Sequence, residues 1–298
     1  MFEEVVLDGD VRPLLDGLTA GIAAIEPRRC VAAAVRRDRD ALVLGGQRVA
    51  LPDRPVRVLG LGKAAIAMAW GLHDTLGQQP LRGAVATPVP GPAPAGLDVV
   101  TGGHPVPDAG SLAAGERLLA EASAAASGDL VVVLVSGGGS ACAEVPPPGV
   151  GLEALAGLNR LLLASGAPIG EVNTVRRAVS RLKGGRLATA AAPAAVVTVI
   201  VSDVVGNDLP TIAGGPTVAD RTGAAEAAVV LDRYGLSGRV DPTVLAVLDK
   251  GAVAPPPEPG PLVIAADGGT AAAAAAEAAR RHGIEAAVIA TDLTGAAD

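Results

Sequence analysis

Short runs of apolar residues recur along this chain, and stretches with helical periodicity separate them. The clearest runs cover residues 56–61, 130–135, 196–201 and 261–266. Each run is apolar along most of its length rather than at alternate positions, which is typical of a strand buried on both faces of a parallel sheet. The alternation of strands with helices predicts an α/β fold: a doubly wound, mostly parallel sheet with helices on both faces, of the Rossmann-like type.

The remaining elements follow from the same periodicities. Helices are predicted at residues 63–76, 111–126, 152–164, 171–191, 224–234 and 270–282, and further strands at 82–87, 98–101 and 285–290. The proline-rich segment 251–260 (GAVAPPPEPG) is the stretch most typical of a linker. We therefore expect one α/β domain over residues 1–250. We expect residues 251–298 to form a linker and a strand–helix–strand segment packed on the same domain.

Composition excludes several classes of function. Phe2, Trp70 and Tyr234 are the only aromatic residues, and the formal net charge is −7. A chain without basic surface or stacking rings is a poor binder of nucleic acid. Two isolated cysteines favour a reducing compartment, and the sequence shows neither a secretory signal nor a clean apolar span of about 20 residues. These features predict a cytoplasmic protein that binds neither nucleic acid nor membrane.

Polar residues follow most of the predicted strands. Gly62-Lys63 comes after the first of the four clear runs, Ser136–Ser140 after the second, Ser202-Asp203 after the third and Asp267–Thr270 after the fourth. In an open α/β sheet, ligands bind beyond the carboxyl ends of the strands. The sequence therefore predicts a single site at that edge of the sheet.

The second of these segments contains three consecutive glycines: Ser136, Gly137, Gly138, Gly139 and Ser140. Successive backbone N–H groups without Cβ atoms can turn toward an anion, and the two hydroxyl groups add donors. A phosphate or a carboxylate suits such a nest. The alternative is a tight strand exit that packs on a neighbouring element.

Lys63 stands at a junction between a strand and a helix. The segment Gly60-Leu-Gly-Lys63 lacks the GxxxxGK[ST] spacing of a P-loop, and Ala64 occupies the place of the magnesium-binding hydroxyl. A lysine at this point can still reach an anion as a point charge. Because a cation is unfavourable at a helix N-terminus, we favour a functional lysine over one that merely extends into solvent.

The segment 171–188 carries a polar stripe. Asn173, Arg176, Ser180 and Lys183 fall at offsets 0, 3, 7 and 10, on one face of the predicted helix, and Gly184 then ends or bends it. Asn and Ser are mediocre helix formers, and a merely solvated face would favour Glu and Lys. The stripe therefore indicates an anion-binding face, with a solvated face as the alternative.

Carboxylates gather in the segment SDVVGNDLP, which contains Asp203 and Asp208. Oxygen ligands beside phosphate groups suit Mg²⁺, which takes one or two carboxylates together with phosphate and water. Asx residues that form turns are the alternative. The three histidines are scattered without metal-binding spacing, so no zinc site is predicted.

Five blocks of the sequence, in this order, resemble the type II glycerate kinases. The blocks are LGLGKAAIAMA, GHPVPD, VLVSGGGSA, GAPIGEVNTVRRAVSRLKGGRLA and VSDVVGNDLPTIAGGPTVAD. Proteins of this family are glycerate 2-kinases with an N-terminal DUF4147 domain and a C-terminal MOFRL domain. The resemblance implies phosphorylation of D-glycerate to 2-phosphoglycerate, with ATP and Mg²⁺ as cofactors.

The resemblance also implies roles for individual residues. Lys63 and Arg176 match residues with catalytic roles, and Asp203 and Asp208 match metal ligands. The residues matched to the binding of substrate and phosphate are Ser136, Gly137, Gly138, Gly139, Ser140, Asn173, Lys183 and Gly184. The expected partners are glycerate and ATP, together with a second copy of the chain or a separate MOFRL-type chain.

The sequence also departs from the family pattern. It ends at Asp298 without the MOFRL domain, and it carries Ala178 and Gly214 where the family has histidine and serine. One alternative is therefore a catalytically impaired α/β module that binds a sugar acid, a nucleotide or a MOFRL-type chain. Another is a hydroxypyruvate reductase, although no GxGxxG motif with a ribose-binding acid about 20 residues later is present.

Overall fold

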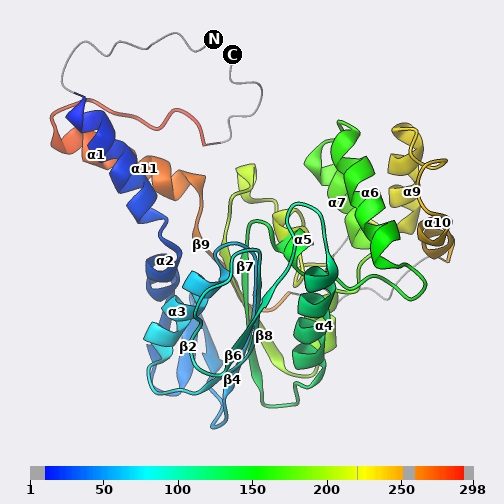
Figure 1. Ribbon diagram of the computed structural model, residues 1–298. Helices are drawn as coiled ribbons and strands as arrows, with labels where there is room; N and C mark the ends of the chain where they lie inside the picture. The colour runs from blue at the N-terminus through cyan, green and yellow to red at the C-terminus, as the bar shows by residue number, and fades with distance from the viewer. Residues whose placement is uncertain (1–10, 220, 251–258, 292–298) are drawn as a thin grey trace.

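The computed structural model describes residues 11–219, 221–250 and 259–291. Its centre is a six-stranded sheet in the order β6-β5-β4-β7-β8-β9, and every neighbouring pair is parallel (Figure 1). The strands are β4 (Val56–Leu61), β5 (Leu81–Thr87), β6 (Leu97–Thr101), β7 (Leu130–Ser136), β8 (Ala195–Val201) and β9 (Leu262–Ala266). The prediction of a parallel α/β sheet is confirmed.

The order of the strands creates a switch point. The chain enters the sheet at β4, moves outward through β5 and β6, and returns to β7 on the other side of β4. The segments that leave β4 and β7 therefore diverge in opposite directions. In sheets of this kind, the crevice at such a switch point is the usual place for a ligand.

Helices cover both faces of the sheet (Figure 1). The α-helices are α1 (Arg12–Ala24), α2 (Pro27–Ala34), α3 (Ala65–Leu76), α4 (Ala109–Ser123), α5 (Gly139–Cys142), α6 (Leu152–Ala164), α7 (Ile169–Ala178), α8 (Arg186–Ala191), α9 (Ala224–Arg233), α10 (Pro242–Asp249) and α11 (Gly268–Arg281). Two short 3₁₀ turns, η1 (Val205–Asn207) and η2 (Ile212–Gly214), follow β8.

Strand β7 shows why residues 130–135 are apolar at every position. Val131 and Val133 belong to the core beneath α4 and α8, whereas Val132 and Leu134 belong to the core beneath α2 and α3. All seven residues of the strand are buried. Because both faces are covered, an alternating pattern would place polar side chains in one of the two cores.

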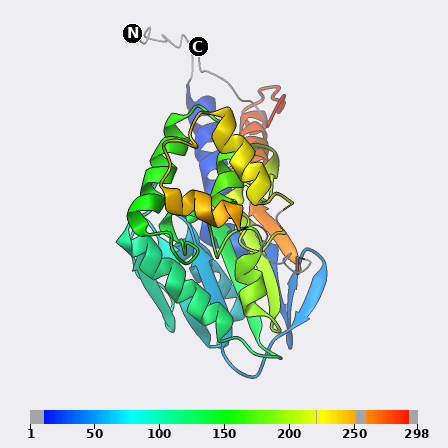
Figure 2. The same cartoon turned by 90° about the vertical axis from the view of Figure 1, so that its right-hand side faces the viewer.

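A third cluster of buried residues joins α6, α7, α9 and α10, away from the sheet. Figures 1 and 2 show these helices as a group above the end of the sheet at which α5 lies. On the other side of that end, α1 and α11 lie side by side and project from the body of the protein. The carboxyl edge of the sheet thus lies between two helical groups.

Several elements differ from the prediction. The expected helix over 171–191 is two helices, α7 and α8, separated by an irregular segment at 179–185. The expected strand at 285–290 has no regular structure. An antiparallel meander was not predicted: β1 (Val35–Asp38), β2 (Ala41–Leu44) and β3 (Gln47–Ala50). Within the described residues, no helix is long and apolar enough to cross a membrane.

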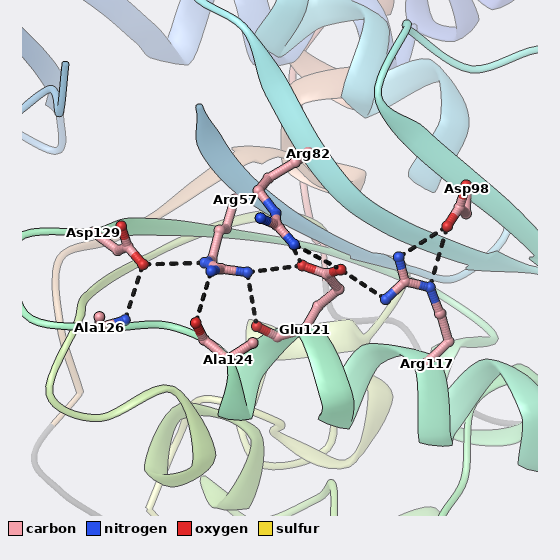
Figure 3. A network of polar contacts seen from close by, with 8 residues as sticks. All are labelled: Arg57, Arg82, Asp98, Arg117, Glu121, Ala124, Ala126 and Asp129. Atoms are coloured by element: carbon pink, nitrogen blue, oxygen red, sulfur yellow. Dashed lines mark hydrogen bonds and ion pairs between the residues drawn. The ribbon is translucent and has the colours of Figure 1, made fainter. Parts of the chain in front are cut away.

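An ion-pair network closes the amino ends of the strands, opposite the switch point (Figure 3). The buried Arg57 guanidinium donates to Asp129 Oδ2 at 3.2 Å, to Glu121 Oε2 at 2.8 Å and to the Ala124 carbonyl at 2.7 Å. Arg117 binds the other Glu121 oxygen at 2.7 Å. With Arg82 of β5 and Asp98 of β6, the network joins three strands to α4. Its centre, formed by Arg57, Glu121 and Asp129, is buried, whereas Arg82 and Asp98 are exposed.

The network makes stability depend on pH. Desolvation alone would raise the pKa of Asp129, but hydrogen bonds from Ala126 N–H and Arg57 outweigh it, so the pKa lies below 3.8. A carboxyl with a lowered folded-state pKa contributes stability above its ordinary pKa and loses that contribution as the pH falls. Acid should therefore unfold the protein as these carboxylates take up protons.

Replacing Arg57 by methionine should leave two buried carboxylates with too little positive charge around them. We expect the free energy of unfolding at pH 7 to fall by about 3 kcal/mol and acid unfolding to begin at a higher pH than in the wild type. Urea denaturation followed by circular dichroism at several pH values measures both effects. The control is Arg48→Met, which removes an exposed ion pair with Asp38 and should cost less than about 1 kcal/mol. Equal losses in the two variants would contradict the prediction.

Candidate functional site

The segments that leave β4 and β7 are joined at the switch point by hydrogen bonds. Lys63 N–H donates to the Gly137 carbonyl at 2.9 Å, and Ala64 N–H donates to Ser136 Oγ at 3.0 Å. The Ser136 hydroxyl is thereby used to hold the start of α3. The structure thus brings Lys63 and the glycine segment into direct contact, as the sheet order requires.

Glycine is required where these two segments cross. Gly62 has φ of +118°, and a Cβ atom there would lie 2.4 Å from both the carbonyl oxygen and Oγ of Ser136. A Cβ atom on Gly137 would lie 1.9 Å from Asp203 Oδ2. A side chain at Gly62 would displace the backbone of Ser136, whereas one at Gly137 would displace only the exposed Asp203 carboxylate. The glycines therefore allow the ends of β4, β7 and β8 to approach one another.

The glycine turn, residues 136–140, presents free backbone donors. Within the described part of the chain, the N–H groups of Gly137 and Gly138 donate to no acceptor. Gly138 has φ of +84°, and the four-residue helix α5 follows it. Successive N–H groups exposed by a left-handed glycine form an anion-binding nest.

Two side chains cover this turn. A Cβ atom on Gly138 would lie 3.1 Å from His104 Cδ2 and 3.2 Å from Lys63 Cγ. Lys63 is exposed, and in the described residues its ammonium group makes no hydrogen bond or ion pair. Its charge is therefore available to an anion held by the turn.

Arg176 approaches the turn from α7 and is only 9% exposed. Its guanidinium donates to the Ser140 carbonyl at 2.8 Å, while its Nε has no partner in the described structure. Ser140 Oγ and Asn173 Oδ1 are likewise buried without a partner. Burial lowers the pKa of Arg176, although the charge of Glu144 opposes this shift. Unpartnered buried polar atoms are costly, and together they indicate the place of a ligand.

His104 joins the site although it was not among the predicted site residues. It lies on the loop after β6, and desolvation, Lys63 and Arg176 lower its pKa below 6.5, while Asp203 opposes the shift. The imidazole is therefore neutral at pH 7. The one signal that could have identified it is its position in the GHPVPD block.

Lys183 and Gly184 lie behind the site rather than facing it. Lys183 is 2% exposed and forms a buried ion pair with Glu144, whose other oxygen accepts from Ser180 Oγ. The Gly184 N–H donates to the Gly214 carbonyl at 2.9 Å. These groups support the wall that carries Arg176. Sequence reasoning did not identify Glu144, because it stands beside a proline run with no motif of its own.

The two candidate metal ligands occupy different positions. Asp203 is exposed and lies directly against the glycine turn. Asp208 accepts a hydrogen bond from Thr211 Oγ1 at 2.5 Å, at the start of the η2 turn. The described residues contain no cluster of three or more metal-ligating side chains. Mg²⁺ needs only one or two carboxylates when phosphate oxygens and water complete its shell, so Asp203 fits that role.

The charge pattern of the site fits a phosphorylated cofactor. Lys63 and Arg176 flank free N–H groups, and the buried Arg176 Nε and Ser140 Oγ have hydrogen-bonding capacity to spare. Phosphate groups provide several strong acceptor oxygens for such donors. The residues present therefore fit the triphosphate of ATP, with Asp203 as the adjacent carboxylate.

Comparison with known proteins gives a consistent result. The family model described as a domain of unknown function, DUF4147, matches residues 14–249. The glycerate 2-kinase of Pyrococcus horikoshii is 35% identical over 231 residues, which are 77% of this chain and 52% of that protein. A protein of Agrobacterium vitis with the provisional name hydroxypyruvate reductase is 41% identical over 69% of this chain and 47% of its own length. The chain therefore spans about half the length of these curated relatives.

Solved structures agree with the sequence comparison. The PH0495 protein of Pyrococcus horikoshii superposes with a TM-score of 0.81 at 32% identity, over 94% of this chain and 65% of that one. The glycerate kinase of Thermotoga maritima superposes with a TM-score of 0.78 at 31% identity, over 93% of this chain and 64% of that one. The fold described above is therefore shared with the matched part of these proteins.

Proposed function

Because the chain belongs to the DUF4147 family of glycerate 2-kinases, we propose that it provides the phosphate-binding half of an ATP-dependent glycerate 2-kinase. The reaction transfers a phosphoryl group from ATP to D-glycerate and yields 2-phosphoglycerate and ADP. The observation that supports this proposal best is the group of unpaired donors at the switch point. Arg176 Nε and the N–H groups of the glycine turn have no acceptor in the described structure.

Phosphoryl transfer depends mainly on positioning and on electrostatic stabilisation of the charged transition state. The glycine turn offers N–H donors to phosphate oxygens. Arg176 is fixed by the Ser140 carbonyl and supplies a rigid cation from one side, and Lys63 supplies a mobile cation from the other. The neutral His104 imidazole lies next to Lys63 and can accept the proton of the attacking hydroxyl group. Arg176 Nε and the N–H groups of the glycine turn have no other partner in the described structure.

Mg²⁺ is the second cofactor in this proposal. When bound, it neutralises charge on the phosphate oxygens. Asp203 would hold it at the glycine turn, and we retain Asp208 as a second candidate ligand. Asp203 is the carboxylate that adjoins the proposed phosphate position.

The direct test supplies the purified protein with ATP, Mg²⁺ and D-glycerate and measures 2-phosphoglycerate. Product formation supports the kinase. Thermal protection by ATP without product supports the second candidate, a binding module, which the unpaired donors at the switch point also favour. Consumption of NADH with hydroxypyruvate would support a reductase and contradict both.

The buried Arg176 guanidinium, which has an unpaired Nε, leads to a separate prediction about anion binding. In the wild type, inorganic tripolyphosphate should raise the melting temperature, because a ligand that binds only the folded state stabilises it. Arg176→Met keeps the aliphatic stem and removes the charge. The tripolyphosphate concentration that gives half-maximal protection should therefore rise at least tenfold. Differential scanning fluorimetry measures the shift. The control Arg160→Met removes an exposed arginine on α6 and should leave the protection unchanged. Undiminished protection in Arg176→Met would contradict the assignment.

A further inference from the structure

A pocket lies beside the phosphate-binding turn, at the carboxyl ends of β8 and β9. Its volume is about 330 Å³, and its lining includes Ile25, Val204, Asn207 and Asp267. Small-molecule pockets span roughly 300–1,000 Å³, so this one is large enough for a compact ligand. Asp203 also lines it. Because the same carboxylate adjoins Gly137, the pocket borders directly on the glycine turn.

The charges of this pocket are opposite to those of the turn. Two carboxylates, Asp203 and Asp267, line it, and none of its described lining residues is a lysine or an arginine. Hydrogen bonds from the Thr270 backbone and then from the Asn207 side chain lower the pKa of Asp267, so it is ionised at neutral pH. A phosphate or the carboxylate of glycerate would meet like charge here. The ligand of this pocket is therefore uncharged or a donor of hydrogen bonds.

One acceptor in the pocket lacks a partner. Asn207 donates through Nδ2 to Asp267 Oδ2 at 2.7 Å, which fixes the amide, but its Oδ1 is buried and unpaired in the described structure. The apolar side chains of Ile25 and Val204 line the same pocket. The site thus combines an unused acceptor with apolar contact surface, which suits a ligand with hydroxyl groups and a flat apolar ring.

We propose that this pocket binds the nucleoside of the phosphate donor, with the ribose hydroxyls near Asn207 Oδ1 and the base against the apolar wall. This inference rests on the proposed kinase function and divides its site into two parts. The phosphate groups bind where Lys63 and Arg176 supply positive charge, and the uncharged nucleoside binds where carboxylates exclude anions. The two parts meet at Asp203.

The two parts can be separated experimentally with fragments of ATP. Adenosine carries the nucleoside alone, and inorganic tripolyphosphate carries the phosphates alone. Asn207 has φ of +54°, so Asn207→Gly removes the side chain without adding backbone strain. We expect this variant to weaken adenosine binding about fivefold, the effect of one lost hydrogen bond, and to leave tripolyphosphate binding unchanged. Arg176→Met should show the reverse pattern.

Titration calorimetry of the folded variants measures both ligands, with adenosine at millimolar concentrations. Arg39→Gly is the matched control, because it replaces another residue with positive φ, 55°, in a remote turn, and it should change neither affinity. Adenosine binding that Asn207→Gly does not affect, or no adenosine binding at all, would overturn the nucleoside pocket. Equal binding of ribose and adenosine would also overturn it, because the base would then contribute nothing. If the wild-type protein does not bind tripolyphosphate, the proposed function is refuted instead.

Discussion

Replacing Lys63 by alanine is expected to reduce phosphoryl transfer by a factor of about 10²–10³ without changing the stability of the protein. The side chain is exposed and makes no hydrogen bond or ion pair in the described structure, so its removal leaves no buried group unsatisfied. Its Cγ and Cε lie close to Gly138, so in the proposed reaction its charge would stabilise negative charge at the glycine turn. The measurement is kcat for 2-phosphoglycerate formation, together with the melting temperature of each variant.

The protein offers a matched control for this experiment. Lys250 is an exposed lysine that follows α10, and Lys250→Ala should leave both kcat and the melting temperature unchanged. Wild-type turnover in Lys63→Ala would remove Lys63 from the mechanism. A large fall in the melting temperature would show instead that this lysine supports the fold.

The second large effect concerns stability. Glu144→Gln should reduce the free energy of unfolding by about 3–5 kcal/mol, because breaking a buried ion pair leaves an uncompensated charge. Glu144 is 1% exposed and Lys183 is 2% exposed, so water cannot replace the lost partner. Adding Lys183→Met should restore most of the stability, because the double variant has no unpaired charge at this position. Urea denaturation of the single and double variants measures the coupling.

The pH dependence of Glu144→Gln provides an independent check. Burial lowers the pKa of Lys183 below 10.5, and Glu144 partly opposes this shift. Without Glu144 the folded state should release the lysine proton at a still lower pH, while the unfolded state keeps it up to about 10.5. Between these values the unfolded state binds more protons, so stability should rise with pH. A variant with wild-type stability at pH 7 would show that the pair contributes nothing.

The central sheet could be predicted because its physical cause is visible in the sequence. A strand covered on both faces must be apolar at successive positions, and residues 130–135 show this directly. Parallel strands end at a common edge, so the polar residues after them had to come together there. That argument places these residues at one edge of the sheet. The direct contact between Lys63 and the glycine turn requires in addition that β4 and β7 are neighbours, which periodicity does not reveal.

Other features depended on contacts that are remote in sequence. The helix predicted through 171–191 ends at Ala178 because the chain turns to bury Lys183 against Glu144, which is 39 residues away. Ser180 caps this break by accepting from the N–H groups of Leu182 and Lys183. Helical periodicity cannot reveal such a break, since Glu144, the partner of Lys183, lies outside the local window.

Local sequence pattern missed the strands of the meander, and it predicted a strand at residues 285–290 that does not form. Strands β1 and β3 carry charged or exposed residues and are only four residues long, so they lack the apolar signal of a strand. Residues 285–290 have that signal, yet Ile289 is 92% exposed and the segment pairs with no described strand. Strand formation requires a neighbouring strand as well as a suitable sequence.

The packing of α1 against α11 has a consequence for how the protein can be made. Gly21 brings the two helices so close that a Cβ atom there would lie 3.0 Å from the Ala271 carbonyl oxygen. The buried face of α1, the first described helix, is therefore covered only after α11, the last described helix, has formed. During synthesis on a ribosome, the strands from β4 to β8 are complete before α11 has emerged, and contacts that are distant in sequence form slowly. A chain truncated before α11 should therefore leave the face of α1 that carries Gly17 and Gly21 without its partner helix.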